Sequence, residues 1–259
     1  MPKNRVKAAL KAGEAVTGPI LHEVRSVGMI KLMAAAGHDF VFIDTEHGMY
    51  SMETVANLAQ MALACGICPL VRPPDLAYHL ISRALDAGAQ GVIVPRVQNR
   101  AEAETVVSFV KYPPVGRRGA GGDGRNAYER RGVRESIEEA NAETLVVLQI
   151  ESAEGLHNVD EIAAVSGVDV LLIGPNDLSI SLGIPGEYET ATFRDAIASI
   201  VAACQKHGVA IGTLGMSGEQ MQPWYEMGFR FLLCNTDGNM VAEAAYRDVA
   251  AMRAFTANG

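Results

Sequence analysis

The sequence predicts an α/β fold, a (β/α)8 TIM barrel in which eight parallel strands close on themselves. Short apolar runs alternate with helical patterns through most of the chain, and eight such runs are present. Alternating strands and helices imply parallel strands joined by right-handed crossovers. The 259 residues match the length of one such barrel, so we expect residues 1–259 to form a single domain.

Eight apolar runs are the predicted strands, because strands buried on both faces of a parallel sheet are continuously apolar. They are residues 19–24, 40–44, 69–72, 91–95, 145–151, 168–173, 210–214 and 229–233. A doubly wound open sheet is the alternative architecture. No GxGxxG motif follows the first run, which disfavours a dinucleotide-binding version of that sheet.

Helical patterns occupy intervals between these strands, at residues 51–64, 75–87, 101–110, 192–206 and 217–227. Ser51 and Asn99 stand where N-cap residues belong. Six glycines stand where a C-cap residue belongs, namely Gly37, Gly66, Gly88, Gly167, Gly208 and Gly228. Residues 239–255 read as a final helix with an apolar side, which would close the barrel or pack on another subunit.

Residues 111–141 interrupt the alternation and are predicted to form a long loop rich in glycine and arginine. Loops of this length inside a compact domain are usually functional or mobile. Backbone amides in residues 116–124 could cradle a phosphate, but the Lys-Ser/Thr pair of a P-loop is missing. A lid or a subunit contact is therefore the favoured interpretation.

Composition excludes several classes of partner. The formal net charge is −8 and no basic stripe is present, which argues against nucleic acid. No stretch approaches the roughly 20 apolar residues that span a membrane, and no signal-like apolar segment follows the basic first residues. We expect a soluble, cytoplasmic protein. Cys65 and Cys68 have the spacing of a redox or zinc pair, but without a second pair we interpret them as structural.

Chargeable side chains follow the strand at 40–44, where Asp44, Glu46 and His47 stand close together in the sequence. Such groups at the end of a buried strand are costly unless they are paired, hydrogen-bonded or metal-bound. The simpler alternative is a capping aspartate and an ordinary loop histidine. The recurrence of the pattern at other strands favours a functional site.

Three further strand ends carry charged residues, Arg72, Glu151 and Asp177. In a parallel barrel these ends meet on one face, where catalytic residues lie. Glu151 and Asp177 suit a hard divalent cation such as Mg²⁺ or Mn²⁺, whereas a zinc site would normally contain more His or Cys.

Arg72 and His47 complete a site that could form an enolate next to a carbonyl. Arg72, fixed by two following prolines, could stabilise an enolate or clamp a carboxylate. His47 could transfer protons near neutral pH. Structural alternatives exist: Arg72 could pair with Asp44 or Glu46, and Asp177 could cap a helix. Glu151 is hardest to explain structurally, because it ends a fully apolar strand.

Six motifs together resemble one known family. They are DTEHG at 44–48, LVRP at 70–73, LDAGAQ at 85–90, YPPVGRRG at 112–119, QIES at 149–152 and GPNDLS at 174–179. In this order they resemble the metal-dependent (class II) pyruvate aldolases of the HpcH/HpaI type. That family includes 4-hydroxy-2-oxoheptanedioate and 2-dehydro-3-deoxyglucarate aldolases. The resemblance runs from about residue 18 to residue 237, nearly the whole chain.

The resemblance implies a carbon-carbon lyase that reversibly cleaves 4-hydroxy-2-oxo acids to pyruvate and an aldehyde through a metal-bound pyruvate enolate. Glu151 and Asp177 would bind the divalent metal, Mg²⁺ or Mn²⁺, with Co²⁺ or Zn²⁺ as alternatives. Its partners would be a small keto acid and an aldehyde. It also implies a homo-oligomer, a trimer or hexamer, in which the last helix of the barrel is exchanged between subunits.

The family also implies roles for individual residues. His47 would act as the base, with Asp86 as its partner, a role that rests on the family alone. Arg72 would stabilise the enolate. The remaining implied substrate-binding residues are Gln149, beside the keto acid, and Gly174, Pro175 and Asn176, around which backbone amides would receive the keto-acid carboxylate. We interpret Asp44 and Glu46 as supporting residues that order water and orient the site.

Two residues depart from the family pattern, and they bear on the substrate rather than on the chemistry. Many members have Ala at Asn176, and some have Met at Arg96. Two other functions remain open. One is a related enzyme that cleaves an acyl-CoA thioester or decarboxylates oxaloacetate, and the other is a non-catalytic barrel that binds a keto acid.

Overall fold

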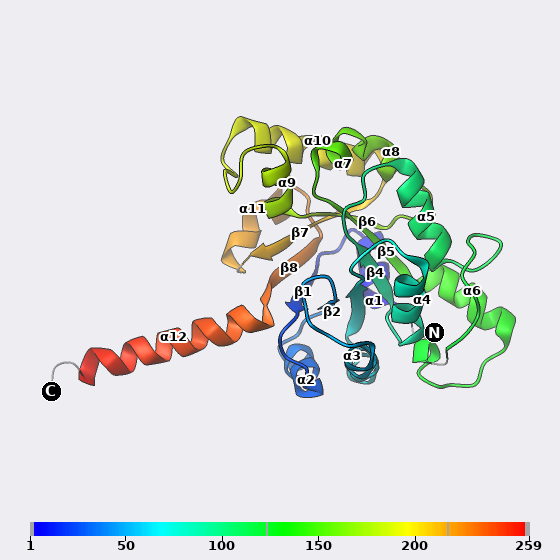
Figure 1. Cartoon of the computed structure of the whole chain (residues 1–259), viewed down its shortest axis with the longest axis horizontal. Coiled ribbons are helices and arrows are strands. Elements are labelled where there is room, and N and C mark those ends of the chain that lie inside the picture. Colours follow the sequence, from blue (N-terminus) through cyan, green and yellow to red (C-terminus); the bar gives the residue numbers. More distant parts are fainter. Residues whose placement is uncertain (1–2, 123, 217, 257–259) are drawn as a thin grey trace.

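The computed structural model describes residues 3–122, 124–216 and 218–256, and it confirms the predicted barrel (Figure 1). Eight strands pair in chain order, and each pairing, including that of the last strand with the first, is parallel. The strands are β1 (Val16–Leu21), β2 (Phe40–Asp44), β3 (Cys68–Arg72), β4 (Gly91–Val94), β5 (Leu145–Ile150), β6 (Val170–Ile173), β7 (Ala210–Met216) and β8 (Phe231–Thr236).

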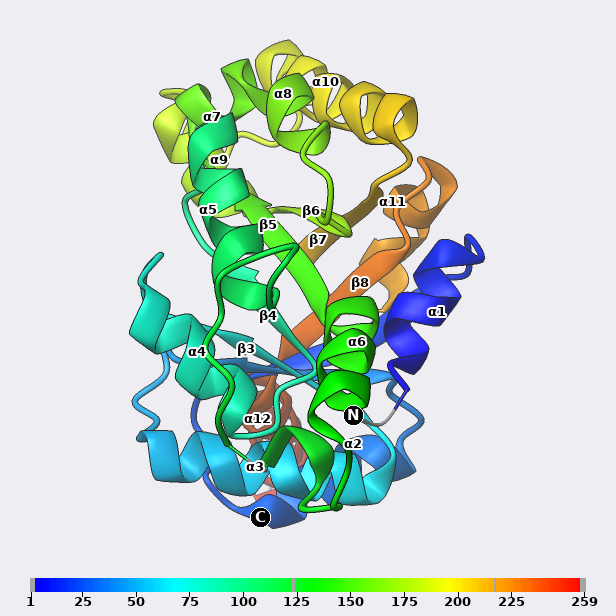
Figure 2. The same cartoon turned by 90° about the vertical axis from the view of Figure 1, so that its right-hand side faces the viewer.

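Helices cover most of the outer face of the barrel (Figure 2). In chain order they are α1 (Arg5–Lys11), α2 (Val27–Ala35), α3 (Met52–Cys65), α4 (Tyr78–Asp86), α5 (Arg100–Val110), α6 (Val133–Glu143), α7 (Ala153–His157), α8 (Val159–Ala163), α9 (Pro175–Ser181), α10 (Ala191–His207), α11 (Gln222–Glu226) and α12 (Asp237–Thr256). Short 3-10 turns lie at Gly124–Asn126 and Glu219–Met221.

Local capping signals in the sequence are confirmed. The side chains of Ser51 and Asn99 accept hydrogen bonds from the amides of Thr54 (3.2 Å) and Glu102 (3.0 Å). All six glycines predicted after helical patterns have positive φ, between 67° and 119°. A side chain at these positions would be strained by the backbone conformation, and at Gly88 and Gly167 a Cβ would also approach a neighbouring side chain within 3.0 Å.

Some predicted bounds are wrong. Strand β1 begins at Val16 and ends at Leu21, because residues 22–24 form a turn whose amides are held by Asp237. Strand β8 begins at Phe231 and extends to Thr236. The helix predicted at 217–227 is a 3-10 turn followed by the five-residue α11, and Ser217 lies outside the described residues.

The predicted loop at 111–141 is also wrong in its second half, where helix α6 (Val133–Glu143) lies. This helix has no side-chain N-cap, since Gly132 precedes it, and it buries only Ser136 and Ala140. Helices are recognised in a sequence by an apolar stripe at helical spacing. Helix α6 has only a short stripe of this kind, at Val133, Ile137 and Ala140, and the glycines and arginines before it favour a loop.

Alternation along the strands divides the core into two parts. Phe40 and Phe42 point into the barrel, where Phe40 stacks on Phe231 with ring centroids 4.5 Å apart. Val41 and Ile43, the alternating residues, pack outward against the helices. Successive side chains of a strand point to opposite faces, so one apolar strand serves both cores. The packed interior leaves the strand ends as the place for polar chemistry.

Helix α12 projects away from the barrel (Figure 1). Its large apolar side chains are exposed, namely Val241, Tyr246, Val249, Met252 and Phe255. Exchange of this helix between subunits stays a prediction. Among the described residues, no helix has the length and apolar character needed to cross a membrane.

Candidate active site

Asp44 and Arg72 form the centre of the polar cluster at the carboxyl ends of the strands. They are register partners on β2 and β3, and Arg72 donates from Nε and Nη2 to the two oxygens of Asp44 at 2.8 and 2.7 Å. Both side chains are buried, with 8% and 2% of their area exposed for Arg72 and Asp44. A forked guanidinium–carboxylate pair of this kind fixes orientation as well as charge.

Asp44 also organises the loop that follows β2. Its Oδ1 accepts the amides of Glu46 at 3.0 Å and His47 at 3.5 Å. Burial alone would raise the pKa of Asp44, but the hydrogen bonds and charge of Arg72 outweigh it and hold the pKa below its usual value. Asp44 is therefore an ionised anchor for Arg72 and for the loop that carries His47.

Glu46 connects two arginines at the mouth of the barrel. Its carboxylate oxygens lie 3.1 Å from Nη1 of Arg72 and 3.2 Å from Nη1 of Arg96. The same carboxylate is 4.0 Å from Nε2 of His47. The Glu46 side chain is only 8% exposed, whereas that of His47 is 69% exposed. The predicted base thus lies at the rim, open to solvent, above a buried ionic network.

Glu151 follows the end of β5 and is buried beside other carboxylates. One of its oxygens accepts the amide of Arg96 at 2.7 Å, and the other accepts the side-chain amide of Gln149. Burial is the main reason that the pKa of Glu151 is raised to about 6; the Arg96 amide opposes this shift, and the charges of Glu46 and Asp177 add to it. Gln149 also receives a hydrogen bond from Arg72 at 3.4 Å. The predicted residues on β3 and β5 are thus brought together.

The charges of this cluster fit a divalent cation. Four carboxylates (Asp44, Glu46, Glu151 and Asp177) stand against two guanidiniums (Arg72 and Arg96), an excess of two negative charges when all are ionised. Among the described residues, no group of three or more His, Cys, Asp or Glu side chains could by itself hold a metal. Two carboxylates with water and substrate as further ligands would suit Mg²⁺, which keeps several waters when protein-bound.

The segment between β6 and α9 lies directly against Glu151. A Cβ on Gly174 would stand 2.7 Å from Oε2 of Glu151 and 2.9 Å from Nε2 of Gln149, so glycine is required there for close approach. The Gly174 amide donates to the Ile150 carbonyl at 3.3 Å, and proline has no N–H to donate. That amides around this segment receive a carboxylate stays a prediction.

Asn176, which follows Gly174 and Pro175 in α9, brings a polar side chain to this segment. Its side-chain oxygen accepts a hydrogen bond from the hydroxyl of Tyr188. Both Asn176 and the following Asp177 are exposed at the start of α9. The polar pair of Asn176 and Tyr188 thus lies in the segment predicted to bind the substrate, and that binding stays a prediction.

Asp86 is not brought to His47 within one chain. It ends α4, at the side of the barrel where strands begin, and accepts a hydrogen bond from Arg118 at 2.6 Å. In the part of the chain that the structure describes, no hydrogen bond or ion pair joins Asp86 to His47. The predicted partnership would need a second subunit and stays a prediction.

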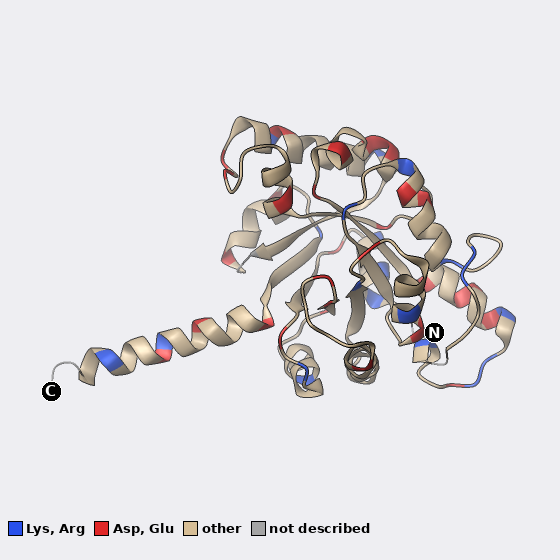
Figure 3. Cartoon of the chain, viewed as in Figure 1, with Lys and Arg blue, Asp and Glu red and all other residues tan. Residues whose placement is uncertain are grey.

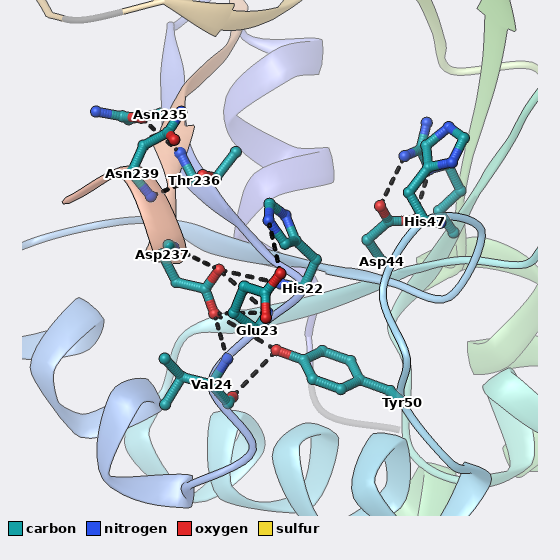
Figure 4. Close-up of polar contacts among 12 residues, drawn as sticks. His22, Glu23, Val24, Asp44, His47, Tyr50, Asn235, Thr236, Asp237 and Asn239 are labelled. Carbon is teal, nitrogen blue, oxygen red and sulfur yellow. Dashed lines mark hydrogen bonds and ion pairs between the residues drawn. The ribbon is translucent and has the colours of Figure 1, made fainter. Parts of the chain in front are cut away.

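A buried carboxylate that sequence reasoning missed lies at the end of β8. Asp237 accepts the amides of His22, Glu23 and Val24 at 3.2, 3.2 and 2.8 Å, and Tyr50 donates to the Val24 carbonyl at 3.0 Å (Figure 4). The signal was available, because Asp237 follows the last strand as Asp44 ends the second. The predicted strand ended too early for it to be noticed.

A hollow beside α1, away from this cluster, is not a second candidate site. A cavity of about 600 Å³ beside α1 is lined by residues that include Arg5, His38 and Asp39. It lies where strands begin, whereas the active sites of such barrels lie where strands end. The candidate site is therefore the ionic cluster at the opposite face.

The fold and this cluster define a (β/α)8 barrel of the enzyme type, with acidic, basic and proton-transfer groups at the carboxyl ends of its strands. The chain belongs to the HpcH/HpaI aldolase/citrate lyase family, whose model matches residues 24–244. The predicted resemblance is thereby confirmed.

Individual relatives agree with this assignment. A 4-hydroxy-4-methyl-2-oxoglutarate aldolase from Chaetomium globosum is 35% identical, covering 93% of this chain and 92% of that protein. A hydroxypyruvate/pyruvate aldolase from Sagittula stellata is 35% identical, covering 95% and 96%. The crystal structure of an HpcH/HpaI aldolase from Desulfitobacterium hafniense superposes with a TM-score of 0.91 at 31% identity, covering 95% of this chain and 96% of that chain.

Proposed function

We propose that this protein is a divalent-metal-dependent aldolase that reversibly cleaves 4-hydroxy-2-oxo acids to pyruvate and an aldehyde. The observation that carries the proposal is the buried Glu151 beside Asp177 and Arg72, with the exposed His47 at the rim above them. The names of the two aldolase relatives support the same reaction class. In the cleavage the C3–C4 bond breaks, the C4 hydroxyl loses its proton, and C3 gains one, so no redox partner is needed.

Glu151 and Asp177 would hold the divalent cation, Mg²⁺ or Mn²⁺, with Co²⁺ or Zn²⁺ as alternatives. When bound, such an ion acts as a Lewis acid that polarises a carbonyl oxygen and stabilises negative charge on it. The carboxylate excess around Glu151 supports this assignment, because an added cation would relieve the repulsion from Glu46 and Asp177 that adds to burial in raising the pKa of Glu151.

Arg72 would supply a fixed positive charge for the oxygen that gains charge as the C3–C4 bond breaks. Asp44 and Glu46 form ion pairs with its guanidinium, and Gln149 accepts a hydrogen bond from Nη1. A charge held in advance at the correct place stabilises a transition state without reorganisation at the moment of reaction. Gln149 itself would lie beside the keto acid.

His47 would take the proton of the C4 hydroxyl, directly or through a water. Its exposure supports this role, because the acceptor half of the substrate would enter from the solvent-facing rim. Asp86 of a neighbouring subunit would be the partner of His47. We further propose a homo-oligomer, a trimer or hexamer, in which the exposed apolar side of α12 is covered by another subunit.

Replacement of His47 tests whether this residue acts as the general base. H47A should lower kcat for pyruvate release from a 4-hydroxy-2-oxo acid by at least about 100-fold, as expected for loss of a general base. Metal affinity, measured by calorimetry with Mn²⁺, should change by less than about threefold. H157A, on α7, is the matched control and should retain activity. Unchanged turnover in H47A would contradict the role of His47.

The family description includes citrate lyases, so a related reaction is the second candidate. It would be the decarboxylation of oxaloacetate or cleavage of an acyl-CoA thioester. Assays with oxaloacetate and with a hydroxyacyl-CoA, run beside the aldol assay, separate these reactions by their products. A protein that binds pyruvate but turns over none of these substrates would be a non-catalytic keto-acid-binding barrel.

A further inference from the structure

Arg96 is an exposed cation at the mouth of the candidate site. It follows β4, and its backbone amide donates to Glu151 at 2.7 Å, so the residue is attached to the centre of the site. Its guanidinium lies 3.2 Å from Glu46 through Nη1 and donates to the Pro74 carbonyl at 2.9 Å through Nη2. Even so, its side chain is 58% exposed. No hydrogen bond or ion pair among the described residues uses Nε of Arg96.

Arg72 differs in each of these respects. Its side chain is only 8% exposed. Nε and Nη2 donate to Asp44, and Nη1 interacts with Glu46 and Gln149. It has little capacity left for a second carboxylate beyond the keto-acid half of a substrate. Arg96 therefore remains the guanidinium of the site with donors that an incoming group can reach.

The backbone of Arg96 is held in an unusual conformation. Its φ of +54° lies in the left-handed region, which non-glycine residues with long side chains seldom adopt. Strain of this kind persists only where surrounding contacts impose it, and it concentrates at functional sites. Here the conformation lets one residue give its amide to Glu151 and extend its side chain over Glu46.

We propose that Arg96 binds a carboxylate on the acceptor half of the substrate, so that the enzyme prefers aldehydes or ketones that carry their own negative charge. This inference rests on the proposed aldolase function. With the keto-acid half between Glu151 and Arg72, the acceptor half extends toward the rim where Arg96 is exposed. A guanidinium can serve two carboxylates at once, as Arg72 does with Asp44 and Glu46.

The test compares two acceptors of similar size and different charge, glyoxylate and glycolaldehyde, condensed with pyruvate by the metal-loaded enzyme. The readout is the ratio of kcat/KM for glyoxylate to kcat/KM for glycolaldehyde. In R96M this ratio should fall at least tenfold, mainly through a higher KM for glyoxylate. R96K keeps the positive charge but not the two-donor geometry of the guanidinium, so this variant should retain part of the preference for glyoxylate.

R100M is the matched control, because Arg100 stands at the start of the next helix and pairs with Glu104 on the surface. R100M also removes one positive charge, but outside the candidate site, so it should leave the ratio of the two kcat/KM values unchanged. An unchanged ratio in R96M, with both acceptors affected equally, would overturn the inference and leave Arg96 a purely structural partner of Glu46. If the unsubstituted enzyme consumes pyruvate with neither acceptor, the aldolase function fails and the inference fails with it.

Discussion

At the scale of single residues, the site is built from charges that compensate one another. Arg72 is buried only because Asp44 and Glu46 accept its donors. Removing one partner of such a pair would leave an unpaired buried charge, which typically costs about 3–5 kcal/mol. The residues proposed for chemistry are therefore also important for stability, and activity losses in their variants need a parallel measurement of unfolding.

Lys111 shows the opposite situation, a buried charge with weak compensation. Its ammonium donates to the carbonyls of Asn141 and Thr144 at 2.8 Å each. Burial, and then the charge of Lys7, lowers the pKa of Lys111 to about 7. The unfolded chain keeps this proton up to about pH 10. The resulting penalty on folding is fully present below pH 7 and shrinks as pH rises from 7 toward 10.

Replacement of Lys111 by Met should remove this pH dependence. Relative to K111M, the unsubstituted protein should gain unfolding free energy as pH rises from 7 to 9, at up to about 1.4 kcal/mol per pH unit. Urea unfolding at pH 7, 8 and 9 measures the difference. K31M, at an exposed lysine of α2, is the control and should leave the pH profile unchanged. A difference between K111M and the parent that is constant with pH would refute this account.

At the scale of elements, strand ends are joined by buried carboxylates. Asp44 holds the loop after β2, and Asp237 holds the turn after β1 from the end of β8, where the barrel closes (Figure 4). Hydrogen bonds to a charged acceptor are typically worth about 1.5–3 kcal/mol. Asp237 thus stabilises the junction between the first and last strands.

Replacement of Asp237 by Asn should destabilise the protein by about 1.5–3 kcal/mol, because the neutral side chain cannot accept all three amides as a carboxylate does. Chemical denaturation measures this loss. D248N, on the exposed part of α12 with 72% of the side chain accessible, should stay within about 0.5 kcal/mol of the parent. Equal stability of D237N and D248N would show that the turn needs no carboxylate.

Elements with local signals were predictable from the sequence, and elements without them were not. The apolar run of β2 and the caps Ser51 and Asn99 are local, so their prediction is confirmed. Helix α6 is polar on most of its surface and has no side-chain cap, so it was missed. The end of β8 depends on pairing with β1, which lies more than 200 residues away in the chain, as the hydrogen bond of Asp237 to His22 (215 residues apart) illustrates.

At the scale of the whole molecule, parallel closure explains why residues far apart in sequence meet. Asp44, Arg72 and Glu151 are predicted to lie together because a barrel brings its strand ends to one face. In the structure Asp44 pairs with Arg72, and Gln149 links Arg72 to Glu151. The contacts of Arg96 could not be predicted, since its backbone conformation is imposed by distant neighbours.

Basic and acidic residues are interspersed among the elements seen in Figure 3. Helix α12 carries residues of both signs, and the arginines at 117 and 118 lie in the segment between α5 and α6.

Release of pyruvate from a 4-hydroxy-2-oxo acid, before and after removal of metal, tests the central claim most directly. We predict that exhaustive chelation abolishes release and that Mg²⁺ or Mn²⁺ restores it, whereas E151Q protein shows little restoration with either ion. The loss of one of only two proposed carboxylate ligands is the physical reason for the second expectation. Full aldol cleavage by protein shown to contain no metal would contradict the account.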